Sequence, residues 1–553
     1  MAHLSLALLP LLFAAPPAAV ATEGTDEAVV EAALEKIETD EIEVHVRYLA
    51  SRALEGRDSP STGLDRAAQY LCERFAEAGL VYAPRCAERW AAESQAPMPA
   101  WSQAGEADGT FLWPYRIGEL PGGGREGFQF TRPVPDACSL ELLVEGEPAR
   151  EFAYGEDFVP LRGCDGDVRG ELVFAGFAIS SKTEKYDDFK RLDVADKVAL
   201  VFEGEPEHAK KFDGEEVTDE ASLWRKLHLL HEQRARGALI VRRTAPPVEG
   251  DAHPRLGFRY TLAFFQGSRP ERQREVVPAL EISMECATAL LGQDAEKLLE
   301  KLDRSARPTL VKDAVARQVS FRGATEAGGV VVHNVVGLVP GSDAALAAEY
   351  VVVGAHYDHI GVGVRGRIGL GADDNASGTA ALLAIARALR EAAPRRSVLV
   401  VAFASEEDGL IGSRRFVEDL PVPAGKVAGM INLDMIGRGK ASVVTLLGGG
   451  PNPDMAEAVK RAKRIAKTGI SKLEFDDDPG LFQRSDQYSF HEAGIPSIFF
   501  MEDMPIAVNK EYHTWMDTPD LVDMQKVANT ARLAFTTAWI LANDDGRPAP
   551  PHD

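Results

Sequence analysis

The stretch VVVGAHYDHIGVG, residues 351–363, decides the fold of this chain. Its apolar first half is typical of a strand buried on both faces, yet it runs without a turn signal into His356, Asp358 and His359. Ionisable side chains are costly to bury unless they have partners. Ligands of an open parallel sheet bind beyond the carboxyl ends of its strands, so we interpret these residues as the rim of a site.

Three more apolar runs in the C-terminal half end in the same way. SVLVVAFASEE ends at Glu406 and Glu407, VAGMINLDMIG contains Asp434, and IPSIFFME ends at Glu502. Strands alternate with helical patterns here, which predicts an α/β fold with a mostly parallel, doubly wound sheet and helices on both faces. Side chains that are far apart in the sequence should therefore converge at one edge of this sheet.

The residue types at this edge are typical of a metal site. Two imidazoles and three carboxylates are the candidate ligands: His356, Asp373, Glu407, Asp434 and His513. Zinc and similar divalent ions prefer such ligands. Five ligands exceed what one ion needs, whereas two ions that share a carboxylate would each have three protein ligands and a place for water. Asp358 lies on the same strand face as His356 and is expected to accept its other imidazole N–H.

Taken singly, these residues have plainer explanations. A histidine at a strand end is usually structural, and the adjacent acids Glu406 and Glu407 also suit the first turn of a helix. Asp434 is harder to explain in this way, because an aspartate inside an apolar run is seldom buried without a partner. Asp486 and Asp517 fit a role beside the ligands, but solvated loop acids are the ordinary case.

Composition limits the partners of the chain. Its 553 residues, 45% of them hydrophobic, can bury a large core and exceed one typical domain. With 61 basic and 85 acidic residues the net charge is −24, which argues against nucleic acid and anionic membranes as partners. No C-x-x-C pair occurs, so neither a cysteine zinc site nor a dense disulfide scaffold is indicated. Cys138 and Cys164 remain a possible pair in an oxidising compartment.

The N-terminus predicts export. Residues 1–21 are apolar and then rich in small residues, and Ala19, Val20 and Ala21 form an A-x-A cleavage site, as in a secretory signal peptide. The expected location is the periplasm or the outside of the cell. No contact with a membrane is expected once the signal has been removed.

Four further parts follow the signal. Residues 22–135 contain helical patterns and then an irregular segment, and are expected to pack on the catalytic domain. Residues 136–314 are expected to be an insert that contains a small β-rich domain with a covering helix. Residues 315–545 are the expected catalytic α/β domain, and residues 546–553 a disordered tail.

Five motifs of this chain resemble a known family. In order they are GAHYDH (354–359), GADDNASG (371–378), FASEEDGLIGS (403–413), NLDMIGR (432–438) and YHTWMDT (512–518). They resemble the two-zinc aminopeptidase family that includes the bacterial leucyl aminopeptidases and aminopeptidase Y. Residues 49–80 are similar to the family's N-terminal helices, and residues 176–206 resemble the protease-associated domain that is often inserted ahead of the metal-binding half.

The resemblance implies a role for each candidate residue. Asp373 would bridge two zinc ions, which His356 and Asp434 on one side and Glu407 and His513 on the other would complete. Glu406 would be the general base for a metal-bridging water, and Tyr512 would steady the tetrahedral intermediate, although a packed tyrosine explains Tyr512 equally well. The family often has a cis peptide next to the bridging residue, here at Asp374. His359 matches no clear metal position and is left out of the ligand set.

The sequence therefore predicts a secreted zinc-dependent aminopeptidase that acts on peptides, in an oligomeric state that the sequence leaves open. A carboxypeptidase of the same clan is one alternative and requires a cationic pocket for the substrate carboxylate. A glutaminyl cyclase, with one zinc ion, is a second, and a receptor-like binding protein that has lost catalysis is a third. The protease-associated insert and the full ligand set argue against the cyclase, and the presence of Glu406 together with all five ligands argues against the binding protein.

Overall fold

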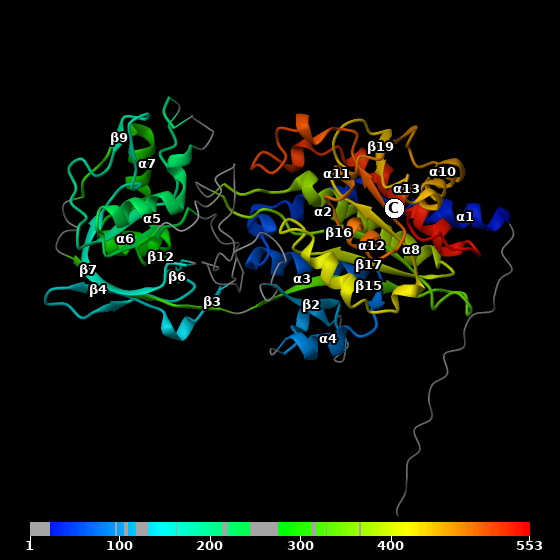
Figure 1. Cartoon of the computed structure of the whole chain (residues 1–553), viewed down its shortest axis with the longest axis horizontal. Helices are drawn as coiled ribbons and strands as arrows, with labels where there is room; N and C mark the ends of the chain where they lie inside the picture. The colour runs from blue at the N-terminus through cyan, green and yellow to red at the C-terminus, as the bar shows by residue number, and fades with distance from the viewer. Residues whose placement is uncertain are drawn as a thin grey trace, which may run out of the picture.

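The computed structural model shows two large sheets, each with its own helices, and two short two-stranded pairs (Figure 1). Its described residues are 23–94, 97–103, 109–117, 131–161, 163–208, 210–212, 218–243, 275–311, 317–327, 329–363 and 367–552. The predicted signal peptide, residues 1–21, lies outside them. Within these ranges, no helix combines the length and the apolar composition that crossing a bilayer requires.

The larger sheet has a parallel centre. β16 (Tyr350–His356) lies between β17 (Ser397–Phe403) and β18 (Val427–Leu433) and runs parallel to both, and β21 (Ser497–Met501) extends the parallel set beyond β18. The chain passes from β16 to β17 on one side and then to β18 on the other, so the strand order reverses at β16. Ligand sites of such sheets lie at the carboxyl ends of the strands beside this point.

Antiparallel strands complete both edges of the larger sheet. β15 (Val330–Val339) pairs antiparallel with β17 and also with β1 and β2. On the opposite edge β19 pairs antiparallel with β21 and parallel with β20. The predicted mostly parallel sheet is thus confirmed, with antiparallel strands at its margins. These strands are β1 (Val81–Tyr82), β2 (Leu112–Ile117), β19 (Val443–Leu447) and β20 (Lys472–Asp476).

Helices cover both faces of the larger sheet, because successive side chains of a strand point to opposite sides. Val351 and Val353 of β16 belong to an apolar core that includes α8 and α13, whereas Val352 belongs to a separate core with α9 and α12. The first face carries α1 (Glu23–Leu34), α2 (Thr39–Leu49), α3 (Thr62–Glu77), α8 (Gly378–Ala392), α10 (Pro453–Ile465) and α13 (Met524–Asn543). The second carries α4 (Cys86–Glu93), α9 (Ile411–Glu418) and α12 (Gln487–Glu492).

The smaller sheet is inserted in the sequence between β2 and β15, and Figure 1 shows it with its helices on the left. Its strand order is β5-β4-β13-β7-β10-β11-β12-β6, with a parallel set from β7 to β12 and antiparallel strands on both sides. The strands are β4 (Ser139–Val144), β5 (Arg150–Glu151), β6 (Phe158–Pro160), β7 (Gly166–Phe174), β10 (Val198–Phe202), β11 (Gly237–Val241), β12 (Ala279–Ile282) and β13 (Arg317–Gly323). The helices are α5 (Leu223–Glu232), α6 (Met284–Leu291) and α7 (Ala295–Ser305).

The boundaries of the insert differ somewhat from the predicted ones. β13 completes the smaller sheet, so the predicted boundary after residue 314 falls just before its last strand in the sequence. The chain enters and leaves this part along β3 (Thr131–Pro133) and β14 (Thr325–Ala327), which pair antiparallel. The C-terminal tail, predicted to be disordered, makes backbone contacts: Ala549 N–H donates to Asp454 and His552 N–H to the oxygen of Pro451, each at 2.9 Å.

Candidate metal centre

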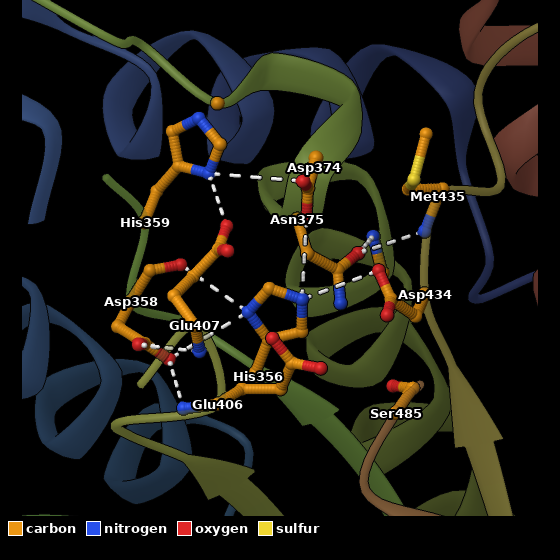
Figure 2. Close-up of polar contacts among 12 residues, drawn as sticks. His356, Asp358, His359, Asp374, Asn375, Glu406, Glu407, Asp434, Met435 and Ser485 are labelled. Atoms are coloured by element: carbon orange, nitrogen blue, oxygen red, sulfur yellow. Dashed lines mark hydrogen bonds and ion pairs between the residues drawn. The ribbon is translucent and has the colours of Figure 1, made fainter. Parts of the chain in front are cut away.

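The strand ends of the larger sheet bring a first group of ionisable side chains together (Figure 2). His356 is the last residue of β16 and is buried. Its Nε2 is 3.2 Å from Oδ1 of Asp434, which follows β18, and 3.3 Å from Oδ1 of Asp374. Glu406, in the segment after β17, belongs to the same group, because potential ligand atoms of His356, Glu406 and Asp434 all lie within 4.8 Å of one another. Such spacing suits a shared cation.

A second group of donors lies on the other side of Asp374. His513 Nε2 is 3.1 Å from Asp374 Oδ2 and 3.0 Å from Glu407 Oε2. The other oxygen of Glu407, Oε1, is 2.8 Å from Nδ1 of His359. Asp374 therefore faces a different histidine with each of its two oxygens and joins the two groups. This is the position that a carboxylate shared by two metal ions requires.

Asp373, predicted to be the shared ligand, does not lie at this point. Its Oδ1 accepts the backbone N–H of Gly437 at 2.8 Å. Asp373 and Asp374 are neighbours in the tight turn η7 (Ala372–Ser377), but their side chains have different contacts. The side chain of Asp373 therefore contacts the segment after β18 and not the two histidines that Asp374 faces. The geometry gives the joining position to Asp374, whose peptide bond to Asn375 is cis.

The cluster carries an excess of negative charge. Against the opposing effect of burial, nearby carboxylates, Asp434 foremost, raise the pKa of His356 well above its ordinary value. Glu407 likewise outweighs burial and raises the pKa of His513 to about 10. In return His513 overcomes burial and lowers the pKa of Glu407 to about 2. These shifts show that the carboxylates favour positive charge at both groups, which a divalent cation supplies.

Asp358 supports the segment that follows β17. Its carboxylate accepts the backbone N–H of Glu406 at 3.2 Å and that of Glu407 at 3.4 Å. The predicted contact with His356 involves the backbone more closely than the side chain, since Nδ1 of His356 is 3.2 Å from the Asp358 backbone oxygen and 3.6 Å from the carboxylate. One residue therefore orients side chains from two strand ends.

Glu406 has the environment of a proton acceptor. It is 8% exposed, and burial, together with the charges of Glu407 and Asp434, raises the pKa of its carboxyl group well above the usual range. A carboxylate with a raised pKa takes up a proton more readily near neutral pH. Its place in the first group also brings it close to His356 and Asp434.

Tyr512 and His513 form the exposed side of the cluster. Their rings stack with centroids 3.8 Å apart, and the His513 side chain is 38% exposed. The hydroxyl of Tyr512 accepts a hydrogen bond from Nη2 of Arg484 at 3.0 Å. Tyr512 is therefore a packed tyrosine whose ring lies on that of His513.

Two loop acids that were expected to be solvated are buried. Asp517 is 1% exposed and accepts the backbone N–H groups of Asp373 and Asp374 at 3.0 to 3.1 Å, so it fixes the turn that carries the joining carboxylate. Burial, followed by the charge of Asp373, raises the pKa of Asp517 to about 8. Asp486 is fully buried, and burial raises its pKa to about 7.

The predicted site residues come together with one exception. The cluster contains or contacts all of them but Asp373: His356, Asp358, Glu406, Glu407, Asp434, Tyr512 and His513. Reasoning from the sequence missed Asp374, because two adjacent acids in a turn give no sign of which one points inward. It also missed His359, since β16 ends at His356 and strand alternation no longer applies three residues later.

Parts of this chain are similar to known proteins. Residues 334–538 match the model of the family described as Peptidase family M28. A probable leucine aminopeptidase of Arthroderma benhamiae is 29% identical over 293 residues, which are 49% of this chain and 77% of that protein. Aminopeptidase YwaD of Bacillus subtilis is 30% identical over 207 residues, 36% of this chain and 43% of the relative. The chain thus spans less than half the length of the latter.

Among solved structures, the aminopeptidase from Aneurinibacillus sp. strain AM-1 aligns with 96% of this chain and 98% of its own, with 19% identity and a TM-score of 0.44. The zinc aminopeptidase of Bacillus subtilis aligns with 94% of this chain and 98% of its own, with 18% identity and the same TM-score.

Proposed function

We propose that this chain, whose residues 334–538 belong to peptidase family M28, is a zinc-dependent aminopeptidase that removes N-terminal residues from peptides. The observation that carries the proposal is the position of Asp374, with one oxygen 3.3 Å from a nitrogen of His356 and the other 3.1 Å from a nitrogen of His513. We also propose, from the apolar N-terminus alone, that the chain is exported.

The donor set fits two divalent ions. His356 and Asp434 would hold one ion and Glu407 and His513 the other, with Asp374 shared between them. Imidazole nitrogens and carboxylate oxygens are the ligands of catalytic zinc, and three protein ligands for each ion leave positions for water and substrate. When bound, the ions polarise the substrate carbonyl and lower the pKa of a water molecule towards neutrality.

The residues of the chain then handle the proton. Glu406 accepts a proton from the attacking water and delivers it to the leaving amine, and its place beside His356 and Asp434 suits this task. Asp358 holds the backbone of Glu406 and so keeps this carboxylate beside the first group. Tyr512, at the exposed side, is placed to contact the substrate next to His513.

The relatives suggest an apolar first residue of the substrate, and a buried apolar cluster adjoins the centre. Met435 follows Asp434 directly and packs with Leu447, Phe482, Phe499 and Met501, and Tyr512 borders the cluster. The names of the Arthroderma benhamiae and Bacillus subtilis relatives agree with an aminopeptidase, and the former with leucine as the first residue.

The arginines near the centre that the structure describes give little support to a carboxypeptidase. Arg438 is 3.1 Å from Glu511, and the guanidinium of Arg367 lies 4.4 Å from the ring centroid of Trp515. Arg484 donates a hydrogen bond to the Tyr512 hydroxyl at 3.0 Å. Arg365 lies outside the described residues. A carboxypeptidase would need at least one guanidinium free to bind the substrate carboxylate.

The test is a substrate panel with zinc-loaded protein. Leucyl, alanyl and lysyl p-nitroanilides should be cleaved, leucine fastest, while N-acetyl-leucyl p-nitroanilide and N-blocked peptides with a free C-terminus should resist. Glu406→Gln is the inactive reference, and Glu418→Gln, an exposed glutamate of α9, is the matched control that keeps full activity. Cleavage of the N-blocked peptides alone would favour the carboxypeptidase instead.

A further inference from the structure

Arg57 is a fully buried arginine outside the segment that matches the family model. It ends the turn η1 (Arg52–Arg57), which connects α2 to α3. Its guanidinium donates hydrogen bonds to four backbone oxygens, those of Leu49, Tyr357, Leu370 and Gly371. A guanidinium has five donors in a rigid, planar arrangement, so it can hold several chain segments at fixed separations.

Three of these oxygens belong to the two loops that carry the metal centre. Tyr357, between His356 and Asp358, accepts from Nε of Arg57 at 2.7 Å. Leu370 and Gly371 precede the turn that contains Asp374 and accept at 2.9 Å and 3.0 Å. The side chain of Arg57 thus ties the end of β16 to the start of that turn.

Backbone contacts strengthen the same connection. His359 N–H donates to the oxygen of Arg57 at 3.1 Å, and Gly361 N–H donates to the oxygen of Gly56 at 3.0 Å. A Cβ on Gly56 would lie 2.5 Å from the oxygen of Gly369, so only glycine fits this close approach. The N-terminal turn therefore lies directly against the loop that follows His356.

The third strand end is contacted as well. The hydroxyl oxygens of Ser59 and Ser405 are 2.5 Å apart, and Ser405 precedes the proposed base Glu406. Ser405 has a left-handed backbone with φ of 57°, which is unusual for a residue other than glycine and requires support from its surroundings. The segment after Arg57 provides part of that support.

The charge of Arg57 also suits its place. It is buried in the field of four acids of the site region, namely Asp358, Asp374, Glu407 and Asp517. A nearby positive charge reduces the repulsion among such carboxylates. Arginine is weakly hydrated and keeps its charge when buried more readily than lysine does.

We propose that Arg57 is a positioning residue of the metal centre. It holds the loop after β16 and the turn Ala372–Ser377 at the separation at which Asp374 reaches both His356 and His513. The inference rests on the proposed function in so far as these residues bind metal. It gives the N-terminal segment a part in metal binding, because residues 334–538 alone would not hold all the ligands in position.

Arg57→Met and Arg57→Lys test the proposal against a matched control, Arg396→Met. Arg396 is also fully buried and donates to backbone oxygens, those of Leu541 and Asp544, but it stands just before β17, at the end of the strand remote from Glu406. Metal affinity is measured by competition with a chromophoric chelator, and kcat and KM with leucyl p-nitroanilide.

Arg57→Met should bind at least one zinc ion about 10 to 100 times more weakly than the parent and lower kcat more than KM changes. Arg57→Lys, which keeps the charge but cannot reach all the oxygens, should fall between. Arg396→Met should lower the melting temperature and leave metal affinity unchanged. A folded Arg57→Met protein with the metal affinity of the parent, or an equal loss of affinity in Arg396→Met, would overturn the proposal.

Hydrogen exchange of the parent protein gives a second test that needs no variant. Coupling between two sites is reciprocal, so zinc should slow exchange at the amides of Ser51 and Leu54 in the N-terminal segment and leave the Arg396 amide unchanged. No change at Ser51 and Leu54 would contradict the inference. A parent that binds two ions but cleaves no aminoacyl substrate would refute the proposed function only, whereas a parent that binds no ion would refute both.

Discussion

The carboxylate of Asp358 accepts the backbone N–H of Glu406 at 3.2 Å, so the end of β16 fixes the residue proposed as the base. Asp358→Ala removes this acceptor and should lower kcat about 10- to 100-fold, because the base is no longer held in place. Asp358→Asn keeps one acceptor oxygen and should lose less. Steady-state kinetics with leucyl p-nitroanilide measure both, and an unchanged kcat in the alanine variant would refute the role.

The adjacent glutamates should respond differently to the same substitution. Glu406→Gln removes the base but keeps the size of the side chain, so turnover should fall roughly 10²- to 10⁴-fold while two ions remain bound. Glu407→Gln replaces a carboxylate that faces His513 at 3.0 Å and should weaken metal binding itself. Metal analysis after gel filtration, paired with kinetics, separates the two. Equal metal loss in both variants would make Glu406 a ligand.

The neighbouring aspartates of the turn Ala372–Ser377 provide a third comparison. Asp374→Asn removes the charge that joins the two groups and should reduce the bound metal to one ion or fewer. Asp373→Asn should keep both ions, because an asparagine oxygen can still accept from the Gly437 N–H. The measurement is metal content per chain. The opposite pattern would restore Asp373 as the shared ligand.

Metal binding should stabilise the folded protein. Two ions per chain are expected, and a chelator should abolish activity reversibly. A ligand that binds only the folded state adds about 2.7 kcal/mol for each site at a free concentration of 100 times its Kd. Thermal unfolding at several zinc concentrations should therefore show a rising melting temperature. One ion in fully active enzyme would favour the cyclase, and none would end the metal mechanism.

His45 should make stability depend on acid pH. Burial, assisted by the charge of Arg74, lowers the pKa of His45 to about 4, and its Nδ1 is 2.7 Å from the Tyr70 hydroxyl. The folded pKa is below the unfolded value of 6.5, so the unfolded chain binds more protons between these values and stability falls as the pH drops from 6.5 to 4.

The free energy of unfolding should fall by about 3 kcal/mol in total, and this loss should be complete once the pH is below the folded pKa. His45→Gln, which does not titrate, should lack this part of the acid sensitivity. Urea unfolding of parent and variant at pH 7, 5.5 and 4 isolates the difference. A difference in unfolding free energy that stays constant across these pH values would show that His45 titrates normally.

The sequence predicts the centre of the fold well and the details of loops less well. Apolar strands such as 351–355 and 398–403 are continuous because both faces are buried, and the ionisable side chains at their ends converge as expected. The contact between η1 and the loops of the metal centre joins residues some 300 positions apart, for example Arg57 and Tyr357. No pattern among neighbouring residues predicts such a contact.

The direction of a side chain within a loop is equally hard to predict from the sequence. In GADDNASG both aspartates are buried, but the backbone of η7 turns Asp373 towards Gly437 and Asp374 towards the histidines. Asp517 is a loop acid by sequence, yet it is buried because it caps two amides of that turn. Burial of a polar loop residue depends on the tertiary partners that it finds.

The pairing of β3 with β14 brings the two ends of the inserted domain together. Thr131 lies opposite Ala327 and Pro133 opposite Thr325, so the two ends of the insert meet side by side. β2 and β15 pair with each other in the larger sheet without the insert. Because closing a loop costs little more as the loop lengthens, genetic insertion or exchange at this junction would leave the larger sheet intact. The larger sheet, which carries the candidate metal centre, thus shares no described strand with the smaller one.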